Sequence, residues 1–203
     1  MVFFFTVRGG AVVNPSSDGP ATLASSDVTC YMGTDKHENE HLIEWGLPTD
    51  VWFHVERMSS AHVYLRLPRG VSIDQIPRES LEDACQLTKA NSIEGCKKSH
   101  VQIVYTPWAN LHKTADMAVG SIGFHSGRER RHYMVEHRCN AIVNRVTKTK
   151  AERFPDYAGE RRAFEDDELA RRKAATRLAR AEADAANKAD AAARAGRAAE
   201  RQG

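Results

Sequence analysis

The sequence predicts an α+β fold: a mixed, largely antiparallel sheet with packed helices, followed by a long charged C-terminal helix. Three observations support this prediction. Short apolar or alternating runs, bounded by glycine, proline and serine, recur over the first 156 residues. Two longer stretches with helical spacing lie between these runs. After residue 156 the composition shifts to alanine and charged residues. We therefore divide the chain into an α+β domain over 1–156 and a tail over 157–203.

The composition agrees with a chain of which only part packs into a core. Of the 203 residues, 41% are hydrophobic and 28% are charged. The first figure is slightly low and the second slightly high for a globular domain. The net charge is only +2, so an anionic partner has to be met by a local patch of positive charge.

The cysteines and the apolar runs bear on the compartment. Cys30, Cys85, Cys96 and Cys139 form no CxxC pair, which favours free thiols in a reducing compartment over a zinc site or disulfide framework. No apolar run approaches the ~20 residues that a membrane-spanning helix needs. We expect a soluble protein without a membrane span, located in the cytoplasm or the nucleus.

The first 45 residues predict two strands and a helix. The continuous apolar run over 2–7 is typical of a buried strand. Residues 9–27 collect glycine, proline and serine, and we expect a mobile loop insertion. A short strand over 28–32 follows. Residues 35–45 are predicted to form a helix, which Gly46 ends.

A β-hairpin is predicted next. Residues 51–56 and 62–67 alternate between apolar and polar side chains, and Ser59 and Ser60 turn the chain between them. The second strand has apolar residues on one face. On its other face, which we expect to be exposed, lie His62, Tyr64 and Arg66.

The rest of the domain contains the clearest helix. Residues 77–92 place apolar side chains at helical spacing. The remaining predicted elements are strands over 101–106, 121–124 and 133–136 and a helix over 140–150.

The tail is predicted to be a lone helix that is partly disordered at its far end. From Glu160 onward the chain is mostly alanine, arginine, glutamate, aspartate and lysine, with i,i+4 charge pairs such as Glu168–Arg172. Each such pair stabilises a helix by only ~0.2–0.5 kcal/mol. No apolar heptad pattern is sustained, so a coiled-coil dimer is not expected from this segment alone.

One motif suggests a metal. The residues from His37 to His41 read HENEH and match H-E-x-x-H, in which two histidines on one helix face bind zinc. A catalytic zinc needs a third protein ligand, and Glu44 stands where the extended motif has glycine. Acidic residues are in any case favoured in the first turn of a helix. We therefore expect no metal and no cofactor.

A second constellation suggests nucleophilic catalysis. His54, Ser59, Ser60 and His62 lie close together in the sequence. Neither a nucleophile elbow nor a glycine-rich oxyanion segment accompanies them. We therefore expect a protein that is not an enzyme.

Polar and basic residues near aromatic ones remain as candidate binding residues. Such side chains suit contacts with phosphates and stacking on bases. Ordinary solvated charge explains the same pattern equally well, so the pattern alone leaves both interpretations open.

Three stretches resemble the NFACT-R domain and occur in that domain's order. The first runs from Tyr31 to Glu40 and contains a glycine, a lysine and an Asn-acidic pair. The second is DVWFHVERMSSAHVYLRL, over 50–67, and the third is VYTPWANLHKTADMAVGSIGF, over 104–124. The resemblance covers nearly all of residues 1–156. The insertion over 9–27 and the alanine-rich tail depart from the family pattern.

The resemblance implies a non-catalytic module that binds RNA, such as tRNA or rRNA, in a translation or ribosome quality-control setting. We expect Trp52, in the second stretch, to lie in the core. We expect the tail to bind the ribosome or a protein partner. Two alternatives stay open: a module that binds DNA, and a protein-interaction adaptor that uses the helical tail. The candidate nucleic-acid-binding residues are Lys36, Asn39, His54, Ser59, Ser60, His62, Tyr64, Arg66 and Lys113.

Overall fold

A computed structural model describes the backbone of residues 1–9 and 28–200 and the side chains of residues 1–9 and 28–191. The insertion predicted over 9–27 lies outside the described residues, apart from Gly9. The chain separates into two compact units, Met1–Ala158 and Gly159–Gly203.

The described residues of the first unit form a seven-stranded sheet with the order β8-β5-β3-β4-β2-β1-β9. Each pair of neighbouring strands is antiparallel. A small hairpin of β6 (Leu111–His112) and β7 (Gly123–Phe124) accompanies the sheet. The strands of the large sheet are β1 (Val2–Val7), β2 (Val28–Gly33), β3 (Asp50–Val55), β4 (Val63–Arg66), β5 (Val101–Pro107), β8 (Arg131–Val135) and β9 (Ala151–Arg153).

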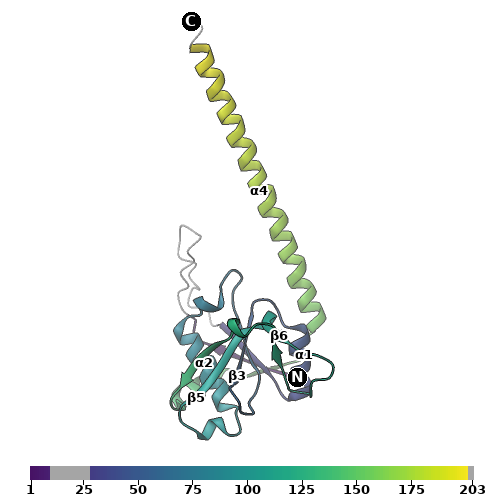
Figure 1. Cartoon of the computed structure of the whole chain (residues 1–203), viewed down its shortest axis with the longest axis vertical. Coiled ribbons are helices and arrows are strands. Elements are labelled where there is room, and N and C mark those ends of the chain that lie inside the picture. Colours follow the sequence, from purple (N-terminus) through teal and green to yellow (C-terminus); the bar gives the residue numbers. More distant parts are fainter. Residues whose placement is uncertain (10–27, 201–203) are drawn as a thin grey trace. The chain divides into compact units, whose positions relative to one another are not determined.

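Helices pack on both faces of this sheet (Figure 1). On one face, α2 and α3 bury Ala84, Leu87 and Val146 against the strands. On the other face, Leu42 of α1 packs with Trp52 and with the β6–β7 segment. The helices are α1 (Lys36–Trp45), α2 (Arg78–Ala90), α3 (Asn140–Thr147) and α4 (Tyr157–Glu200). Short 3-10 turns are η1 (Ile73–Gln75), η2 (Gly95–Lys97), η3 (Trp108–Asn110) and η4 (Gly127–Glu129). The α+β prediction and the long C-terminal helix are confirmed.

The prediction of an exposed face on β4 is wrong. Tyr64 is fully buried and His62 is 8% exposed. Strand alternation does place Val63 and Leu65 in one core cluster and Tyr64 in the other. The error arises because both faces are covered: α1 and the β6–β7 segment pack on the face that the polar pattern marked as exposed.

The helix predicted over 140–150 is shorter than expected. α3 ends at Thr147, where Thr149 Oγ1 donates a hydrogen bond to the Val146 carbonyl at 2.7 Å. Ala151, Glu152 and Arg153 then pair with β1 as the edge strand β9. This strand was missed because an edge strand of three residues carries no apolar alternation.

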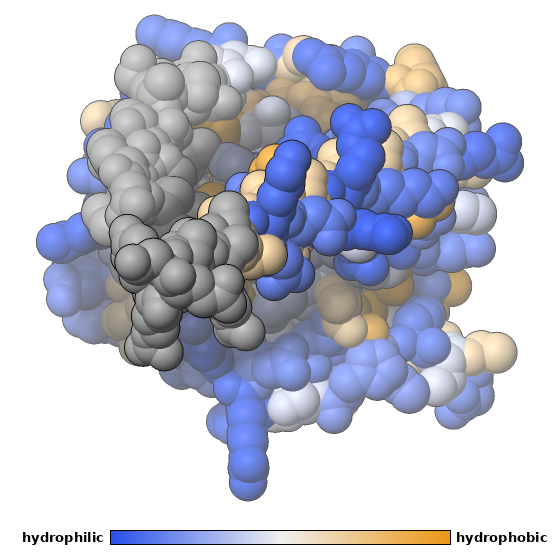
Figure 2. Space-filling model, turned by 90° about the horizontal axis from the view of Figure 1, so that it is seen from above, coloured by the Kyte–Doolittle hydropathy of each residue, from blue (hydrophilic) through white to orange (hydrophobic). Residues whose placement is uncertain are grey.

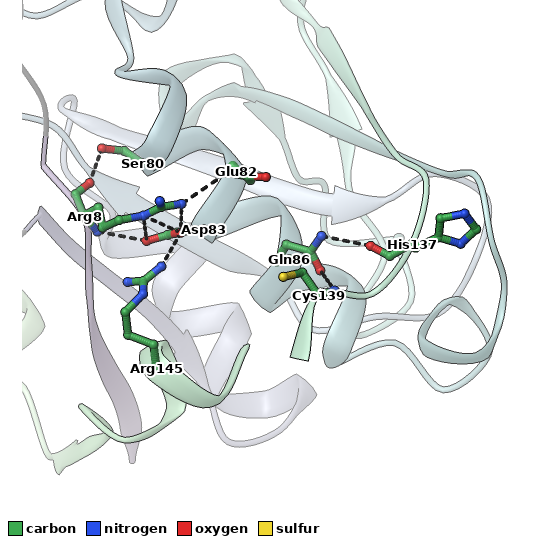
Figure 3. A network of polar contacts seen from close by, with 8 residues as sticks. All are labelled: Arg8, Ser80, Glu82, Asp83, Gln86, His137, Cys139 and Arg145. Atoms are coloured by element: carbon green, nitrogen blue, oxygen red, sulfur yellow. Dashed lines mark hydrogen bonds and ion pairs between the residues drawn. The ribbon is translucent and has the colours of Figure 1, made fainter. Parts of the chain in front are cut away.

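A buried carboxylate joins β1, α2 and α3 (Figure 3). Asp83 of α2 is fully buried and accepts hydrogen bonds from Arg8 and Arg145, with both Nη2–Oδ1 distances at 2.7 Å. Burial by itself raises the pKa of Asp83, but the hydrogen bonds from the two arginines outweigh it and lower the pKa. Nearby, the Gln86 side chain bonds the backbone of His137 and Cys139 at 3.0 and 2.9 Å.

α4 is a continuous helix of 44 residues. The predicted pair Glu168–Arg172 is present at 3.1 Å, and Arg161–Glu165 forms a similar i,i+4 pair. Leu169 and Leu178 are exposed. No helix in the described parts of the chain has an apolar stretch long enough to cross a bilayer.

Candidate nucleic-acid interface

Six of the nine candidate residues, from three separate segments, line one cleft of about 660 Å³. α1 contributes two of them and β3 one, and the other three come from the turn between β3 and β4 and the residue before β4. The six are Lys36, Asn39, His54, Ser59, Ser60 and His62.

The other residues that line the cleft were not among the candidates predicted from the sequence. Apolar side chains come from Phe3, Met32, Ile93 and Val119. The end of α2 is held beside the β3–β4 turn because Ser92 Oγ donates to the Ser59 carbonyl at 2.7 Å. No local pattern marks these residues as binding residues, since each belongs to the cleft only through the packing of distant segments.

Two glycines let the chain approach the cleft closely. A Cβ on Gly33 would lie 3.1 Å from the backbone nitrogen of Asn39, so glycine lets β2 pass directly beside the start of α1. Gly120 has φ +85, the left-handed region that favours glycine. Its amide donates to Glu40 Oε1 at 2.9 Å, which holds this loop against α1.

Two neutral histidines lie beside Trp52 at the cleft. Trp52 is 2% exposed, as expected for a core residue, and its Nε1 donates to His62 Nδ1 at 3.0 Å. His62 Nδ1 must therefore be unprotonated. Burial, followed by the neighbouring His54, lowers the pKa of His62 to about 3. Burial also lowers the pKa of His54, which stacks on Trp52 with ring centroids 5.4 Å apart.

Asn39 is an unusual member of the lining. Its side chain is buried, and Oδ1 accepts a hydrogen bond from the Tyr64 hydroxyl at 3.2 Å. Its Nδ2 is also buried but has no acceptor among the described residues. A buried donor without a partner costs ~1–3 kcal/mol, and native structures contain few of them.

The charges at the cleft lie on Asp35 and Lys36, which are both exposed. The Asp35 carboxylate caps α1 by accepting from the amides of His37 and Glu38 at 2.8 and 2.9 Å. Hydrogen bonds from the Glu38 and His37 amides lower the pKa of Asp35. Since the two histidines are neutral near pH 7, the formal charges of the lining cancel.

Tyr64 and Arg66 do not line the cleft. Arg66 Nε donates to Asp50 Oδ1 at 2.9 Å, and Tyr31 donates its hydroxyl proton to Asp50 Oδ2 at 2.6 Å. Asp50 is fully buried. Arg66 therefore neutralises an internal carboxylate, and Tyr64 is a core residue.

Lys113 supports a wall of the cleft. Its Nζ lies 3.0 Å from Glu40 Oε1 and 2.9 Å from the carbonyls of Ala118 and Ser121. These three contacts use the three protons of the ammonium group. Lys113 thus holds the 118–121 loop beside α1.

Comparisons with known proteins show which family this sequence resembles. The family described as NFACT protein RNA binding domain matches residues 1–126. The chain belongs to the NFACT-R family. Coiled-coil domain-containing protein 25 of Danio rerio is 54% identical over 83% of this chain and 74% of its own length, and the Mus musculus protein is 50% identical over 86% and 77%. Protein JLP2 of Saccharomyces cerevisiae is 44% identical over 66% of this chain and 65% of its own length.

The HENEH segment has a structural role in this NFACT-R domain. Glu38 accepts a hydrogen bond from the Tyr157 hydroxyl, and Glu40 accepts from Lys113 and Gly120. His41 stacks on Tyr157 with ring centroids 6.0 Å apart. Among the described residues, no group of three or more His, Cys, Asp or Glu side chains is placed to hold a metal ion.

Ser60, one of the two serines considered above as possible nucleophiles, also has a structural role. Ser60 Oγ accepts from the Val55 amide and donates to the Ala61 carbonyl, both at 3.0 Å. These bonds close the β3–β4 turn of the NFACT-R domain. Ser59 lies beside it with an exposed side chain.

Proposed function

We propose that this protein is a non-catalytic RNA-binding protein that acts on tRNA or rRNA in a translation or ribosome quality-control setting, in the cytoplasm or the nucleus. Membership of a family described by RNA binding supports RNA as the ligand class. The observation that carries the proposal is the cleft, which brings together six candidate residues from separate segments.

The lining suits weak binding with little sequence preference. Lys36 at the opening is exposed and can meet a phosphate, whereas polar groups and rings line the rest. Contacts to phosphate position a nucleic acid but carry no sequence information. We therefore expect affinity that depends strongly on salt.

Fluorescence anisotropy with a single-stranded oligoribonucleotide of about ten nucleotides tests the proposal. The logarithm of the binding constant should fall linearly with the logarithm of salt concentration, with a slope of about −0.7 per phosphate neutralised. Lys36→Gln should make this slope shallower by about 0.7 because one contact is lost. Lys148→Gln is a matched control, since Lys148 is exposed after α3 and does not line the cleft.

Absence of binding at about 50 mM salt, where electrostatic affinity is strong, would overturn the RNA proposal. The same measurement with a DNA oligonucleotide of identical sequence decides between RNA and DNA, because only RNA presents the 2′-hydroxyl.

A second candidate function is that of an adaptor that binds a protein through α4. The exposed Leu169 and Leu178 on this helix favour it. Under the adaptor hypothesis, Leu169→Ser with Leu178→Ser abolishes partner binding and leaves RNA affinity unchanged. Unchanged partner binding by this double variant would contradict the hypothesis.

A further inference from the structure

One residue that lines the cleft, Asn39, has a buried side-chain donor for which the described residues offer no acceptor. Asn39 is 5% exposed, and its amide oxygen is occupied by the Tyr64 hydroxyl. Its Nδ2 has no acceptor within the described part of the chain. A ligand that enters the cleft with a carbonyl oxygen or an unprotonated ring nitrogen would supply the missing acceptor.

The charges of the lining argue against a phosphate as the group that enters. The charged groups among the lining residues are Asp35 and Lys36, which offset each other and are both exposed. The buried part of the cleft offers neutral His62 and the Asn39 amide. Moving a phosphate away from water into such surroundings costs far more than one hydrogen bond returns.

A flat, neutral, aromatic group fits the same surroundings better. The walls present Phe3, Met32, Ile93 and Val119, and Ile93 is 75% exposed at the edge. Sites for small planar ligands are mostly apolar, with a few placed polar groups that fix orientation. The volume of about 660 Å³ lies within the usual range for such sites, about 300–1,000 Å³.

From these observations we propose that the cleft receives one unstacked nucleobase, whose acceptor atom takes the hydrogen bond of Asn39 Nδ2 while the attached phosphate remains outside near Lys36. The inference rests on the proposed function and makes it specific: the protein binds a base that has left its stack, rather than the backbone alone. Unpaired nucleotides of single-stranded RNA present bases in this way. A free nucleotide carries the same chemistry.

The test compares two ligands with the same charge. Full-length protein is titrated at about 50 mM salt with an oligoribonucleotide of about ten nucleotides and with its abasic counterpart, which has the same ribose–phosphate backbone without bases. We expect the base-bearing strand to bind roughly tenfold tighter or more. This difference should disappear in Asn39→Ala.

Tyr64→Phe is the matched control. It removes the same internal hydrogen bond between the Tyr64 hydroxyl and Asn39 Oδ1 but leaves the Nδ2 donor in place. It should keep most of the preference for the base-bearing strand. If Asn39→Ala does not fold, the side-chain amide resonances of Asn39 in the unaltered protein provide the readout, since they should shift on titration with nucleoside monophosphates.

The outcomes separate this inference from the proposed function. Equal affinity for the intact and abasic strands overturns the base site and leaves RNA binding through the backbone intact. If neither strand binds but nucleoside monophosphates do, the base site is supported and its ligand is a free nucleotide. The RNA proposal then fails. If no strand and no nucleoside monophosphate binds, both proposals fail.

Discussion

His62 and Trp52 form a buried polar contact in which protonation is disfavoured. The indole Nε1 of Trp52 donates to His62 Nδ1 at 3.0 Å, so a proton on that nitrogen would break the bond. Burial and the neighbouring His54 lower the pKa of His62 to about 3. In an unfolded chain the pKa of histidine is about 6.5. The unfolded state therefore binds more protons between these two values.

We predict that His62 makes the fold less stable in acid. The contribution of His62 to the free energy of unfolding is fully present above about pH 6.5. It is lost as the pH falls toward about 3, and the free energy of unfolding then changes by up to ~1.4 kcal/mol per pH unit. His62→Asn keeps an acceptor for Trp52 but cannot titrate, so its free energy of unfolding should depend less on pH in this window. Urea unfolding at several pH values measures this.

Gly46 is a residue where even one methyl group cannot be accommodated. A Cβ at this position would lie 2.2 Å from Cδ1 and Nε1 of the Trp108 ring. That ring is held in place because Nε1 donates to the Ile43 carbonyl at 2.9 Å. We predict that Gly46→Ala lowers the free energy of unfolding by about 1–3 kcal/mol, as overpacking usually does.

Gly127→Ala is the comparison for Gly46→Ala in the same denaturant experiment. The nearest atom to its added Cβ would be Arg130 Nη2, at 3.8 Å, which is an ordinary contact. A change for Gly46→Ala no larger than that for Gly127→Ala would contradict the steric argument.

At the scale of elements, one carboxylate fixes how the helices dock on the sheet. Asp83 of α2 accepts hydrogen bonds from Arg8, the residue that follows β1, and from Arg145 of α3 (Figure 3). Both arginine side chains are 40% exposed, so water screens part of the interaction. The carboxylate itself is not exposed and would be costly to leave unpaired.

We predict that Asp83→Ala lowers the free energy of unfolding by roughly 1.5–3 kcal/mol, the usual cost of losing hydrogen bonds to a charged group. Because the folded pKa of Asp83 is lowered, this contribution is present above the unfolded value of about 3.9 and is lost as the pH falls through the folded pKa. Thermal unfolding at pH 7 and in acid measures this effect. The difference in free energy of unfolding between Asp83→Ala and the parent should be smaller in acid than at pH 7.

Glu82→Ala serves as the matched control in that series. Glu82 bonds Arg8 at 3.1 Å but is 39% exposed. Its removal should cost less than about 1 kcal/mol, since exposed ion pairs contribute little. An equal loss for the two variants would show that burial of Asp83 does not decide the effect.

At the scale of the whole molecule, the two units differ in what stabilises them. Residues 1–158 contain both core clusters, whereas two leucines of the second unit, Leu169 and Leu178, are exposed. Hydrophilic residues predominate on the face shown in Figure 2, with small apolar areas between them. α4 is supported by i,i+4 ion pairs, each of which contributes only ~0.2–0.5 kcal/mol.

We predict that a chain ending at Ala158 unfolds cooperatively with a melting midpoint close to that of the full chain. The reason is that no large apolar side chain among the described residues 159–191 belongs to either core cluster. Differential scanning calorimetry measures the midpoint. A decrease of more than about 10 °C would contradict the prediction.

A chain ending at Asp156 provides the contrast. It loses Tyr157, whose hydroxyl bonds Glu38 and whose ring stacks on His41. We expect this shorter chain to melt at a lower temperature than the one ending at Ala158, because a hydrogen bond to a carboxylate contributes ~1.5–3 kcal/mol.

The sequence by itself determined the fold class, most elements and the family. The apolar runs at 2–7 and 101–106, the helical spacing over 77–92 and the alanine-rich tail each correspond to an element of the structure. These predictions succeed because the periodicity of side chains along a strand or helix is a local property. The edge strand β9 was missed because three residues define no period.

Only the tertiary structure decided which candidate residues share the cleft. Alternation separated His62 and Tyr64 from Val63, but it could not show that α1 packs over Tyr64. Lys113 and Glu40 are 73 residues apart in sequence and meet at 3.0 Å. Contacts across such distances depend on how the helices pack on the sheet. The burial of these residues, the Asn39 Nδ2 that has no acceptor among the described residues and the cancelling charges at the cleft follow from that packing, and no local pattern in the chain encodes them.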